Sequence, residues 1–481
     1  MPAHISRLPF DILQCILEFV DLEDAVSFSM VCTVFQTLTS KRSIWISVLK
    51  RARDVKPIAF PSHEDLTLQP LDSLKRIILH TLRLESNWSL PEPRIIGPVK
   101  AVLLEEFQLD IIFQIPATGL FLMHCRESAS MVLWDIVLGK AASSVIPVGK
   151  RVVDVSPGQD EPGEFSMALL IQDDVGALSI TIVRVEHDKP EPVVGVTFNE
   201  SLPFSHYHWA LFMNEEIVGV LQSPTIFPAT ITFLAFNRLS PDRKATISSD
   251  IQIQDVIGEG HSGSSSVGCD VFLLAERGNI SRQYCCPAEL LPYNWNLDCP
   301  KESNLKCAHI PPISWDYDTR FVCEQLGALS AHPRYGIPAV SLHGLHVEDA
   351  SEGDPMPYIQ IRFWARSKTP SPNLLSVCHV DVPGRLWSST STSWELMLLP
   401  HSGLQVLLLV HHHGLIKLQL VRYHPETNAA TVHHLRVPQF IDMQLVYGLA
   451  LDDHLGAVSL LSGHNTEGGG QQGTIFTIPY A

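Results

Sequence analysis

LPFDILQCILEFVDLED, residues 8–24, is the stretch that decides the fold, because it predicts a short amphipathic helix followed by the start of a second one. Pro9 suits a first helical turn, where its missing N–H costs nothing. Ile12, Ile16 and Phe19 recur at spacings of four and three, which predicts a buried helical face. The helix also carries a second apolar stripe, Leu13, Leu17 and Val20. It is therefore apolar over a wider arc than packing against one neighbour requires.

Two further helices are predicted downstream. Asp21 is a good N-cap candidate with Asp24 three residues on, a carboxylate version of the capping box, so the second helix begins near Leu22. We expect this helix to point four apolar side chains inward, namely Val26, Met30, Val31 and Phe35. A third helix closes the bundle with Ile44, Trp45, Val48 and Leu49. A core of about forty-five residues is marginal alone, which indicates a partner.

Residues 6–50 resemble an F-box in the order and spacing of these features. The shared features are a Leu-Pro at the start of the first helix, an Asp-containing turn, a Val-Cys pair and a Trp near the end. Ala25 departs from the usual larger aliphatic, and Leu22 stands where Pro is common. The resemblance implies binding to a Skp-family adaptor of a cullin-based ubiquitin ligase. The matching residues, which the sequence cannot divide between adaptor face and core, are Leu8, Pro9, Ile12, Ile16, Leu17, Val31, Cys32 and Trp45.

Composition predicts a globular chain of two or three domains, since 481 residues are 45% hydrophobic. No apolar run approaches the roughly 18 residues that span a bilayer, and residues 1–20 lack a secretory pattern, so we expect a cytosolic or nuclear protein. Residues 1–90 hold ten basic and ten acidic side chains, and the remainder holds 24 basic and 41 acidic ones, which gives the whole −17. So acidic a segment would repel phosphate backbones, and nucleic-acid binding is not expected.

The domain boundaries follow from the pattern. We predict an F-box domain at 1–53, a linker and bridging helix at 54–92, and a β-propeller-like domain at 93–481. Pro57, Pro61 and Pro70 mark the connection. A helix at about 71–86 is predicted by the repeat of Leu71, Leu74, Ile78 and Leu82. Its apolar stripe could pack on both the bundle and the following domain, which would make a rigid joint.

From Ile95 onward, short β-like runs bounded by turns replace the helical period. Examples are 109–115, 120–124, 131–136, 166–172, 178–185, 217–221, 231–236, 359–364, 406–410, 416–421 and 475–478. Roughly 390 residues of antiparallel strands cannot close as one small sandwich, so a propeller of six to eight blades fits best. The fold class is thus multidomain α+β, with a helical bundle, a bridging helix and a large all-β domain.

Two local features bear on this architecture. Leu133-Trp134-Asp135-Ile136 resembles the strand-ending signature of WD repeats but occurs once. Asn87-Trp88, which follows the bridging helix, is similar to a feature of fungal F-box proteins with a long β region. Gly468-Gly469-Gly470 lacks the Lys-Ser/Thr and helix of a phosphate-binding loop, so a hairpin loop is expected at 465–473. The run 475–478 is expected to pair with N-terminal strand material and close the ring.

The cysteine and histidine clusters of the sequence do not form a recognisable metal-binding or catalytic motif. Five cysteines lie within 39 residues, at Cys285, Cys286, Cys299, Cys307 and Cys323, but they lack the paired knuckles of zinc sites, so buried thiols are expected. His411 and His413 would share one face of a strand, and His433-His434 forms a second cluster; a half-buried or solvated strand face is the expectation for both. We predict no metal and no cofactor.

Six tryptophans are spread through the β region, at Trp209, Trp295, Trp315, Trp364, Trp387 and Trp394. We expect most of them to cap blade cores and a minority to contact a peptide at the open end of the propeller. A nucleophile elbow and the repeats of sialidase-type propellers are absent from the sequence, so catalysis is not expected.

The sequence therefore predicts a substrate-recognition subunit of a cullin-type (SCF) ubiquitin ligase, with residues 1–55 sufficient for adaptor binding and the β domain binding a protein target. Two alternatives stay open. One is an F-box scaffold that does not promote degradation. The other is a ligand-sensing propeller or hydrolase in which the F-box only controls abundance.

Overall fold

The computed structural model describes residues 8–481 with gaps, and between residues 250 and 334 it describes the strand backbone only. The gaps are residues 18, 62–63, 105–108, 157, 190, 205, 225–229, 241, 253–261, 268–269, 278–279, 287–307, 310–312, 315–320, 331–334, 338, 348–356, 367–374, 388–396, 399–401 and 466–470.

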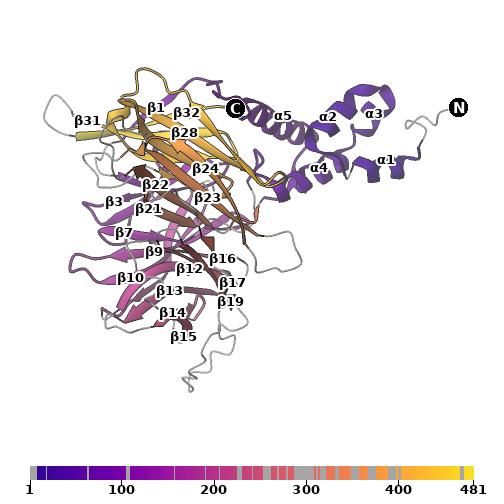
Figure 1. Cartoon of the computed structure of the whole chain (residues 1–481). Coiled ribbons are helices and arrows are strands. Elements are labelled where there is room, and N and C mark those ends of the chain that lie inside the picture. Colours follow the sequence, from indigo (N-terminus) through magenta and orange to yellow (C-terminus); the bar gives the residue numbers. More distant parts are fainter. Residues whose placement is uncertain are drawn as a thin grey trace.

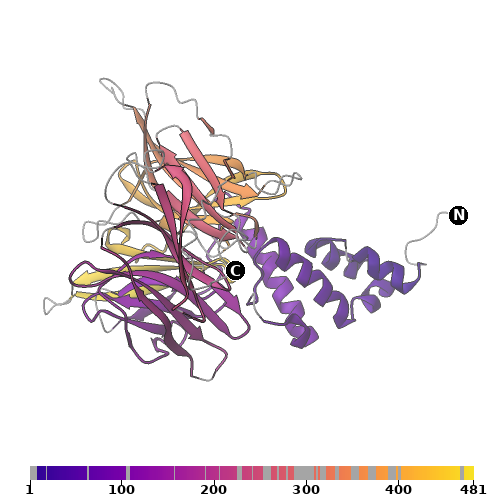
Figure 2. The ribbon, with the colours of Figure 1, turned by 90° about the horizontal axis from the view of Figure 1, so that it is seen from below.

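A helical module precedes a large β domain, and Figures 1 and 2 show it projecting from one side of that domain. Its elements are α1 (Phe10–Leu17), α2 (Leu22–Val31), α3 (Thr33–Leu38), α4 (Arg42–Val55), the 3-10 turn η2 (Leu66–Leu68) and α5 (Leu71–Trp88). Helix α5 lies between the bundle and the β domain (Figure 1). The start of the second helix near Leu22 and the bridging helix are as predicted, although Asp21 makes no side-chain cap hydrogen bond.

The buried face of the first helix differs from the prediction. Helix α1 ends at Leu17, so Phe19 lies in the following turn, where its ring lies 5.9 Å from the Arg51 guanidinium. The buried pair is Leu13 and Leu17, one turn apart, while Ile12 is 44% exposed. The expected stripe is therefore wrong at Ile12 and Phe19, because Leu13 and Leu17 of the second stripe face the core, while Ile16 is partly buried against it.

The second helix is also shorter than predicted. Cys32 adopts an extended conformation (φ −160°, ψ 167°), which ends α2 at Val31 and allows α3 to begin at Thr33. Because the helical phase restarts there, Phe35 is buried but Met30 and Val31 point to solvent, with 75% and 68% of their surface exposed. Met30 and Val31 were therefore wrongly predicted to point inward. The predicted core of Ile44, Trp45, Val48 and Leu49 on α4 is confirmed.

The β domain is a propeller, as predicted, and its described strands form seven antiparallel sheets, here numbered as blades in chain order. Blade 1 comprises β2 (Leu109–Gln114), β3 (Leu120–Cys125), β4 (Ser130–Asp135), β5 (Lys140–Ala141) and β6 (Ile146–Pro147). Blade 2 comprises β7 (Arg151–Val155), β8 (Gln159–Glu161), β9 (Glu164–Gln172), β10 (Leu178–Glu186) and β11 (Val193–Ser201). Blade 3 comprises β12 (His206–Met213), β13 (Ile217–Pro224), β14 (Thr230–Asn237) and β15 (Lys244–Gln252).

The remaining four blades follow the same up-and-down order. Blade 4 comprises β16 (Ser262–Val267), β17 (Asp270–Arg277), β18 (Ile280–Cys286), β19 (Ala308–His309) and β20 (Ile313–Ser314). Blade 5 comprises β21 (Phe321–Ser330), β22 (Ala339–Val347), β23 (Tyr358–Arg366) and β24 (Leu375–Pro383). Blade 6 comprises β25 (Arg385–Leu386), β26 (Met397–Leu398), β27 (Gln405–His412), β28 (Leu415–His424) and β29 (Ala429–Leu435), and the 3-10 turn η6 (Met443–Leu445) follows it. Blade 7 comprises β30 (Val446–Asp452), β31 (Ala457–Asn465), β32 (Gln471–Pro479) and β1 (Lys100–Leu103).

Blade 7 closes the ring with strands from both ends of the β domain. Strand β1 pairs with β32 in antiparallel register, with Val102 opposite Ile475, so the predicted pairing of residues 475–478 with N-terminal strand material is confirmed. This pairing removes the edge that an open sheet would expose. Strands β31 and β32 pair as a hairpin with Asn465 opposite Gln471, so the two ends of the loop predicted at 465–473 belong to paired strands. Residues 466–470 of that predicted loop lie outside the described residues.

Where the structure describes side chains, apolar residues from facing strands fill the spaces between neighbouring blades. The core between blades 1 and 2 includes Leu133 and Leu169, and that between blades 6 and 7 includes Leu409 and Leu460. A further core joins blade 7 to blade 1 through Ile475 and Phe121. Among the described side chains, blades 1, 2, 6 and 7 are each buried on both faces, which holds this part of the ring together.

Candidate functional site

The structure divides the eight F-box signature residues by burial. Leu17 and Trp45 are buried at 1% and 3% exposure, and Ile16 and Cys32 are partly buried against the same core. Leu8, Pro9, Ile12 and Val31 are exposed. The buried pair therefore stabilises the bundle, whereas the exposed four are available to a partner.

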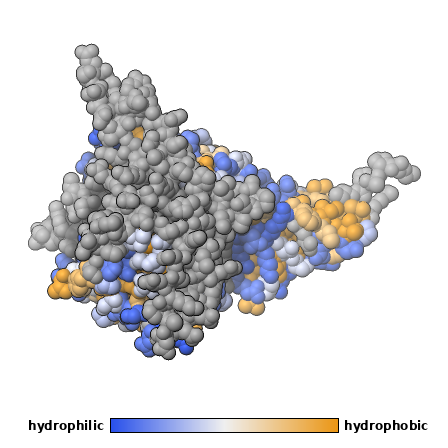
Figure 3. All heavy atoms as spheres, turned by 60° about the horizontal axis from the view of Figure 1, so that its bottom comes forward, coloured by the Kyte–Doolittle hydropathy of each residue, from blue (hydrophilic) through white to orange (hydrophobic). Residues whose placement is uncertain are grey.

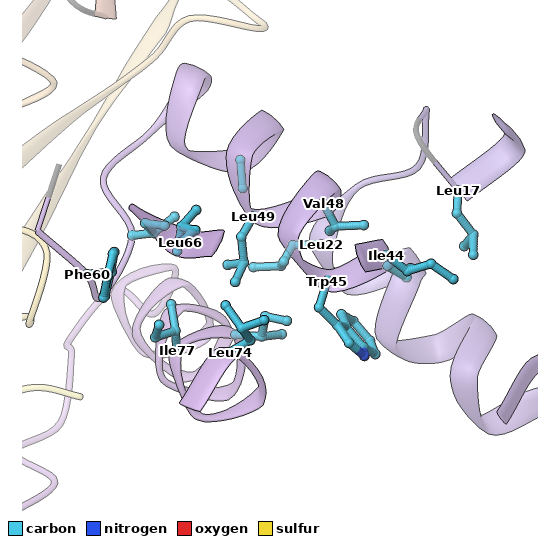
Figure 4. Close-up of a cluster of buried hydrophobic side chains, with 14 of the residues drawn as sticks. Leu17, Leu22, Ile44, Trp45, Val48, Leu49, Phe60, Leu66, Leu74 and Ile77 are labelled. Atoms are coloured by element: carbon cyan, nitrogen blue, oxygen red, sulfur yellow. The ribbon is translucent and has the colours of Figure 1, made fainter. Parts of the chain in front are cut away.

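Trp45 organises the bundle from the inside. Its indole packs with Leu17, Ile44 and Val48 in the cluster drawn in Figure 4. Its Nε1 donates a hydrogen bond to the carbonyl oxygen of Thr39 at 2.6 Å, which satisfies the one polar atom of a buried ring. Because Thr39 ends α3, this bond ties the end of α3 to α4.

Exposed apolar side chains concentrate on the three short helices. Between residues 8 and 38, the large apolar residues with more than a third of their surface exposed are Leu8, Phe10, Ile12, Phe19, Met30, Val31 and Val34. The amine of Lys41 lies 3.3 Å from the centre of the Phe10 ring. Figure 3 shows hydrophobic atoms gathered on the helical module. Contiguous exposed apolar surface is typical of sites that bind a protein, a membrane or a ligand.

Sequence reasoning did not single out Phe10, Met30 or Val34 as partner-facing residues. Helical spacing assigned Met30 to the core, and the break at Cys32 was not visible in the pattern. A usable signal was present nonetheless, because the bundle carries more apolar side chains than a core of this size can bury.

Helix α5 belongs to two cores. Its first half packs Leu74, Ile77 and Ile78 with the residues of α1–α4, as Figure 4 shows for Leu74 and Ile77. Its second half packs Leu84 and Trp88 into the core between blades 6 and 7. The helix thus contacts both domains as predicted, but the predicted stripe of Leu71, Leu74, Ile78 and Leu82 packs on the bundle alone. The propeller is contacted by Leu84 and Trp88, which lie outside that stripe.

Polar contacts fix the second half of α5 on the propeller. Asn87 Nδ2 donates to the carbonyl oxygen of Tyr480 at 2.7 Å. Arg422 Nη2 donates to both carboxylate oxygens of Glu85 at 3.1 Å, and its guanidinium lies 5.4 Å from the Trp88 ring. Burial raises the pKa of Glu85, but Arg422 and Lys56 lower it by more, so the pKa of this carboxyl lies below its ordinary value. Glu85 is therefore ionised and paired at neutral pH.

The chain that follows α5 is also held. His433 Nδ1 lies 2.7 Å from the carbonyl oxygen of Leu90, and His434 N donates to the carbonyl oxygen of Pro91 at 3.1 Å. A carbonyl only accepts, so the His433 nitrogen is the donor. His433 is buried and serves as a structural anchor for the linker.

The other candidate clusters do not converge into a chemical centre among the described residues. His411 is on β27, but His413 lies in the next turn with φ +51°, so the two imidazoles do not share a strand face as predicted. The part of the chain that the structure describes contains no group of three or more His, Cys, Asp or Glu side chains placed to hold a metal ion. The side chains of the five clustered cysteines lie outside the described residues.

The tryptophans can be placed in part. Trp364 is fully buried in blade 5 and donates from Nε1 to Ser341 Oγ at 3.0 Å, which fits the expected role in a blade core. Trp387 is partly buried beside the core between blades 6 and 7. The side chains of Trp209, Trp295, Trp315 and Trp394 lie outside the described residues.

Comparison with known families agrees with this geometry. Residues 5–47 match the family model of the F-box domain. The chain therefore carries an F-box domain followed by a β-propeller, an arrangement that fits an F-box substrate-recognition protein. No curated protein matches the sequence. Among the helices that the structure describes, none is both long and apolar enough to cross a membrane.

A search of solved structures finds matches of very low identity and low TM-score. Kuenenia stuttgartiensis hydrazine synthase is 7% identical with a TM-score of 0.42, covering 78% of this chain and 98% of that chain. Kluyveromyces lactis Hsv2 is 9% identical with a TM-score of 0.35, covering 69% and 87%. The WD40 domain of SCAP from fission yeast is 10% identical with a TM-score of 0.29, covering 79% and 98%. At such scores these structures carry no inference about function.

Proposed function

We propose that this chain is the target-recruiting subunit of a cullin-type ubiquitin ligase. The F-box binds a Skp-family adaptor through the exposed apolar residues of α1, α2 and α3, and the propeller binds a protein target. The chain performs no chemistry itself. It accelerates the transfer of ubiquitin to the target by holding the target near the ubiquitin-charged enzyme, which raises their effective concentration.

The observation that carries this proposal is the split between buried and exposed signature residues. A bundle that only stabilised the chain would turn Ile12 and Val31 inward, yet both are exposed next to a well-packed core. Burying a Val or Ile side chain that would otherwise face water is worth about 1.5–3 kcal/mol. A partner that covers these side chains would gain that energy.

Support for the positioning role comes from α5. Because its two halves belong to the cores of both domains, the F-box and propeller are joined through one continuous helix rather than a flexible tether. A rigid connection keeps the distance between adaptor and target constant, as a proximity mechanism requires.

The test is binding of the purified full chain to a Skp-family adaptor. The double variant Leu8→Ala/Pro9→Ala and the single variant Val31→Asp are each expected to weaken binding by tenfold or more, as loss of central apolar contacts does. Leu239→Ala is the matched control, because Leu239 is 91% exposed on the propeller and lies in the turn after β14. Unchanged affinity of both F-box variants would refute the proposal, and turnover of a captured target with and without the adaptor would separate a ligase subunit from a scaffold.

A further inference from the structure

The turn between β30 and β31, residues Asp452 to Gly456, is a rigid element. Asp452 Oδ1 accepts hydrogen bonds from the backbone N–H groups of His454 and Leu455, at 3.0 and 2.9 Å. Gly456 N donates to the carbonyl oxygen of Asp452 at 2.8 Å, and Gly456 adopts φ +69°, a conformation that favours glycine. Asp452, Asp453 and His454 are all buried. This turn therefore has one well-defined shape.

Each residue of the turn contacts a different part of the molecule. Asp452 Oδ2 lies 3.4 Å from Gln114 Nε2 at the end of β2 in blade 1. Asp453 accepts a hydrogen bond from the hydroxyl of Ser402, which precedes β27 in blade 6. The turn of blade 7 is thus bonded to both neighbouring blades.

The same turn is also hydrogen-bonded to the helical module. His454 Nδ1 lies 2.8 Å from the carbonyl oxygen of Ile58, and His80 Nε2 on α5 lies 3.0 Å from the carbonyl oxygen of Leu455. Both imidazole nitrogens are donors, since a carbonyl only accepts. A histidine of the propeller therefore donates a hydrogen bond to the backbone of the helical module, and a histidine of the helical module donates one to the backbone of the propeller.

Gly456 brings α5 and the closing strand to one point. A Cβ at this position would lie 2.2 Å from Leu84 Cδ1, so the backbone of the turn and α5 pack without room for a side chain. The carbonyl oxygen of Gly456 accepts from Tyr480 N at 2.8 Å, directly after β32 ends. Pro479 in turn accepts a hydrogen bond from Ile96 N, on the segment that leads from α5 into β1.

We propose that the Asp452–Gly456 turn couples closure of the propeller to docking of α5. In this arrangement the helical module keeps its orientation only while β1 is paired with β32. Opening of that pairing shifts the turn and frees α5, and undocking of α5 loosens the same pairing, because coupling between two sites is reciprocal. In an open ring the F-box would therefore be connected to the propeller without a fixed orientation. The coupling is independent of which partner the F-box binds.

Amide hydrogen exchange on the full chain tests the coupling. Val102→Asp places a carboxylate in the β1 side of the core between blades 7 and 1, away from the helical module. Val152→Asp on β7 is the matched control, since Val152 is also partly buried but packs between blades 1 and 2. Val102→Asp is expected to speed exchange in residues 80–88 of α5 by tenfold or more, while Val152→Asp leaves these residues unchanged.

The result that overturns the proposal is faster exchange of β32 in Val102→Asp with no change in α5. A reciprocal experiment decides the question if Val102→Asp fails to fold. His80→Ala removes the bond between α5 and the Leu455 carbonyl without altering the propeller sequence. It is expected to speed exchange at 474–477 on β32 at least threefold, and unchanged exchange there refutes the coupling.

Discussion

Replacing Arg422 with Met is expected to loosen α5 from the propeller, and the effect is expected to shrink in acid. Arg422 lies on β28 and donates to both carboxylate oxygens of Glu85 at 3.1 Å. Met retains an unbranched apolar side chain that can pack on Trp88. The substitution therefore removes the charge and the two hydrogen bonds while it changes the packing little.

The magnitude follows from the surroundings of Glu85. Removing one partner of a fully buried ion pair costs about 3–5 kcal/mol, because the other charge is left unpaired. Here 35% of the Glu85 side chain is exposed, and Lys56 Nζ lies 3.9 Å from its Oε2. Solvent and the second cation screen the unpaired charge. We expect a loss of about 2 kcal/mol at pH 7, or roughly a 30-fold larger population of undocked helix.

The sign of the pH dependence is fixed by the pKa of Glu85. Burial raises this pKa and Arg422 with Lys56 lowers it by more, so the net value lies below the ordinary 4.5. A carboxyl of this kind stabilises the folded state above its unfolded pKa, and that stability is lost as pH falls through the folded pKa. Without Arg422, burial dominates and Glu85 takes up a proton more readily. The penalty of the variant should therefore be smaller at pH 4 than at pH 7 and should continue to fall as the pH drops through the folded pKa of Glu85.

The assay is native-state amide exchange of residues 80–88 in parent and variant at pH 7 and pH 4. Taking the difference between the two proteins at each pH removes the effects of other titrating groups. Arg436→Met is the control, because its pair with Glu92 is exposed on both sides and solvent screens it, so its loss should leave the exchange of residues 80–88 nearly unchanged. A penalty that is equal at both pH values would refute the reasoning, as would one no larger than that of the control.

Three other outcomes are expected. Leu74→Asp buries an unpaired carboxylate in the shared core at a cost of several kcal/mol and should quicken proteolysis near Pro61 and Leu90; resistance equal to the parent would mean that α5 is a solvated tether. Trp45→Ala should lower the unfolding free energy of the bundle by about 3–5 kcal/mol, whereas Val31→Ala should change it by less than about 0.5 kcal/mol; equal thermal shifts would contradict the division by burial. Deletion of residues 470–481 removes β32 and should lower the melting temperature of the whole ring in one transition, so a two-step curve with only one step shifted would count against a single closed ring.

Sequence reasoning succeeded where a pattern is local. The order of Leu-Pro, Val-Cys and Trp over residues 6–50 is a dense signature, and the 3.6-residue period of Leu74 and Ile78 is carried by an uninterrupted helix. The inward face of α1 was predicted wrongly at Ile12 and Phe19, because two stripes of similar hydrophobicity compete and only packing against α4 selects Leu13 and Leu17. Met30 and Val31 were wrongly predicted to point inward, because one extended residue, Cys32, interrupts the helix and changes its phase.

In the propeller the same limit applies. Strands that are buried on both faces, such as β3 and β27, appear in the sequence as short apolar runs, which can be recognised without the structure. Strands with polar or mixed sequence, such as β7 and β16, do not, and their existence depends on pairing with neighbours. The contacts between α5 and the propeller could not be predicted from the sequence for another reason. Glu85 with Arg422 and Asn87 with Tyr480 are more than 300 positions apart, and no local period encodes such contacts.

The shared helix also changes what can be expected of an isolated F-box. The sequence predicted that residues 1–55 suffice for adaptor binding, yet the core of α1–α4 continues into Ile58, Phe60 and Leu66 and into Leu74 and Ile78 of α5. A fragment that ends at residue 55 would leave the α4 side of this core open to water, and so small a unit has little stability to lose. Extending the fragment to residue 90 restores that core but exposes Leu84 and Trp88, which the propeller buries. Since every cut uncovers one of the two cores, adaptor affinity should rise from fragment 1–55 to fragment 1–90 and again to the full chain, and equal affinity of all three would show that the F-box folds without its bridging helix.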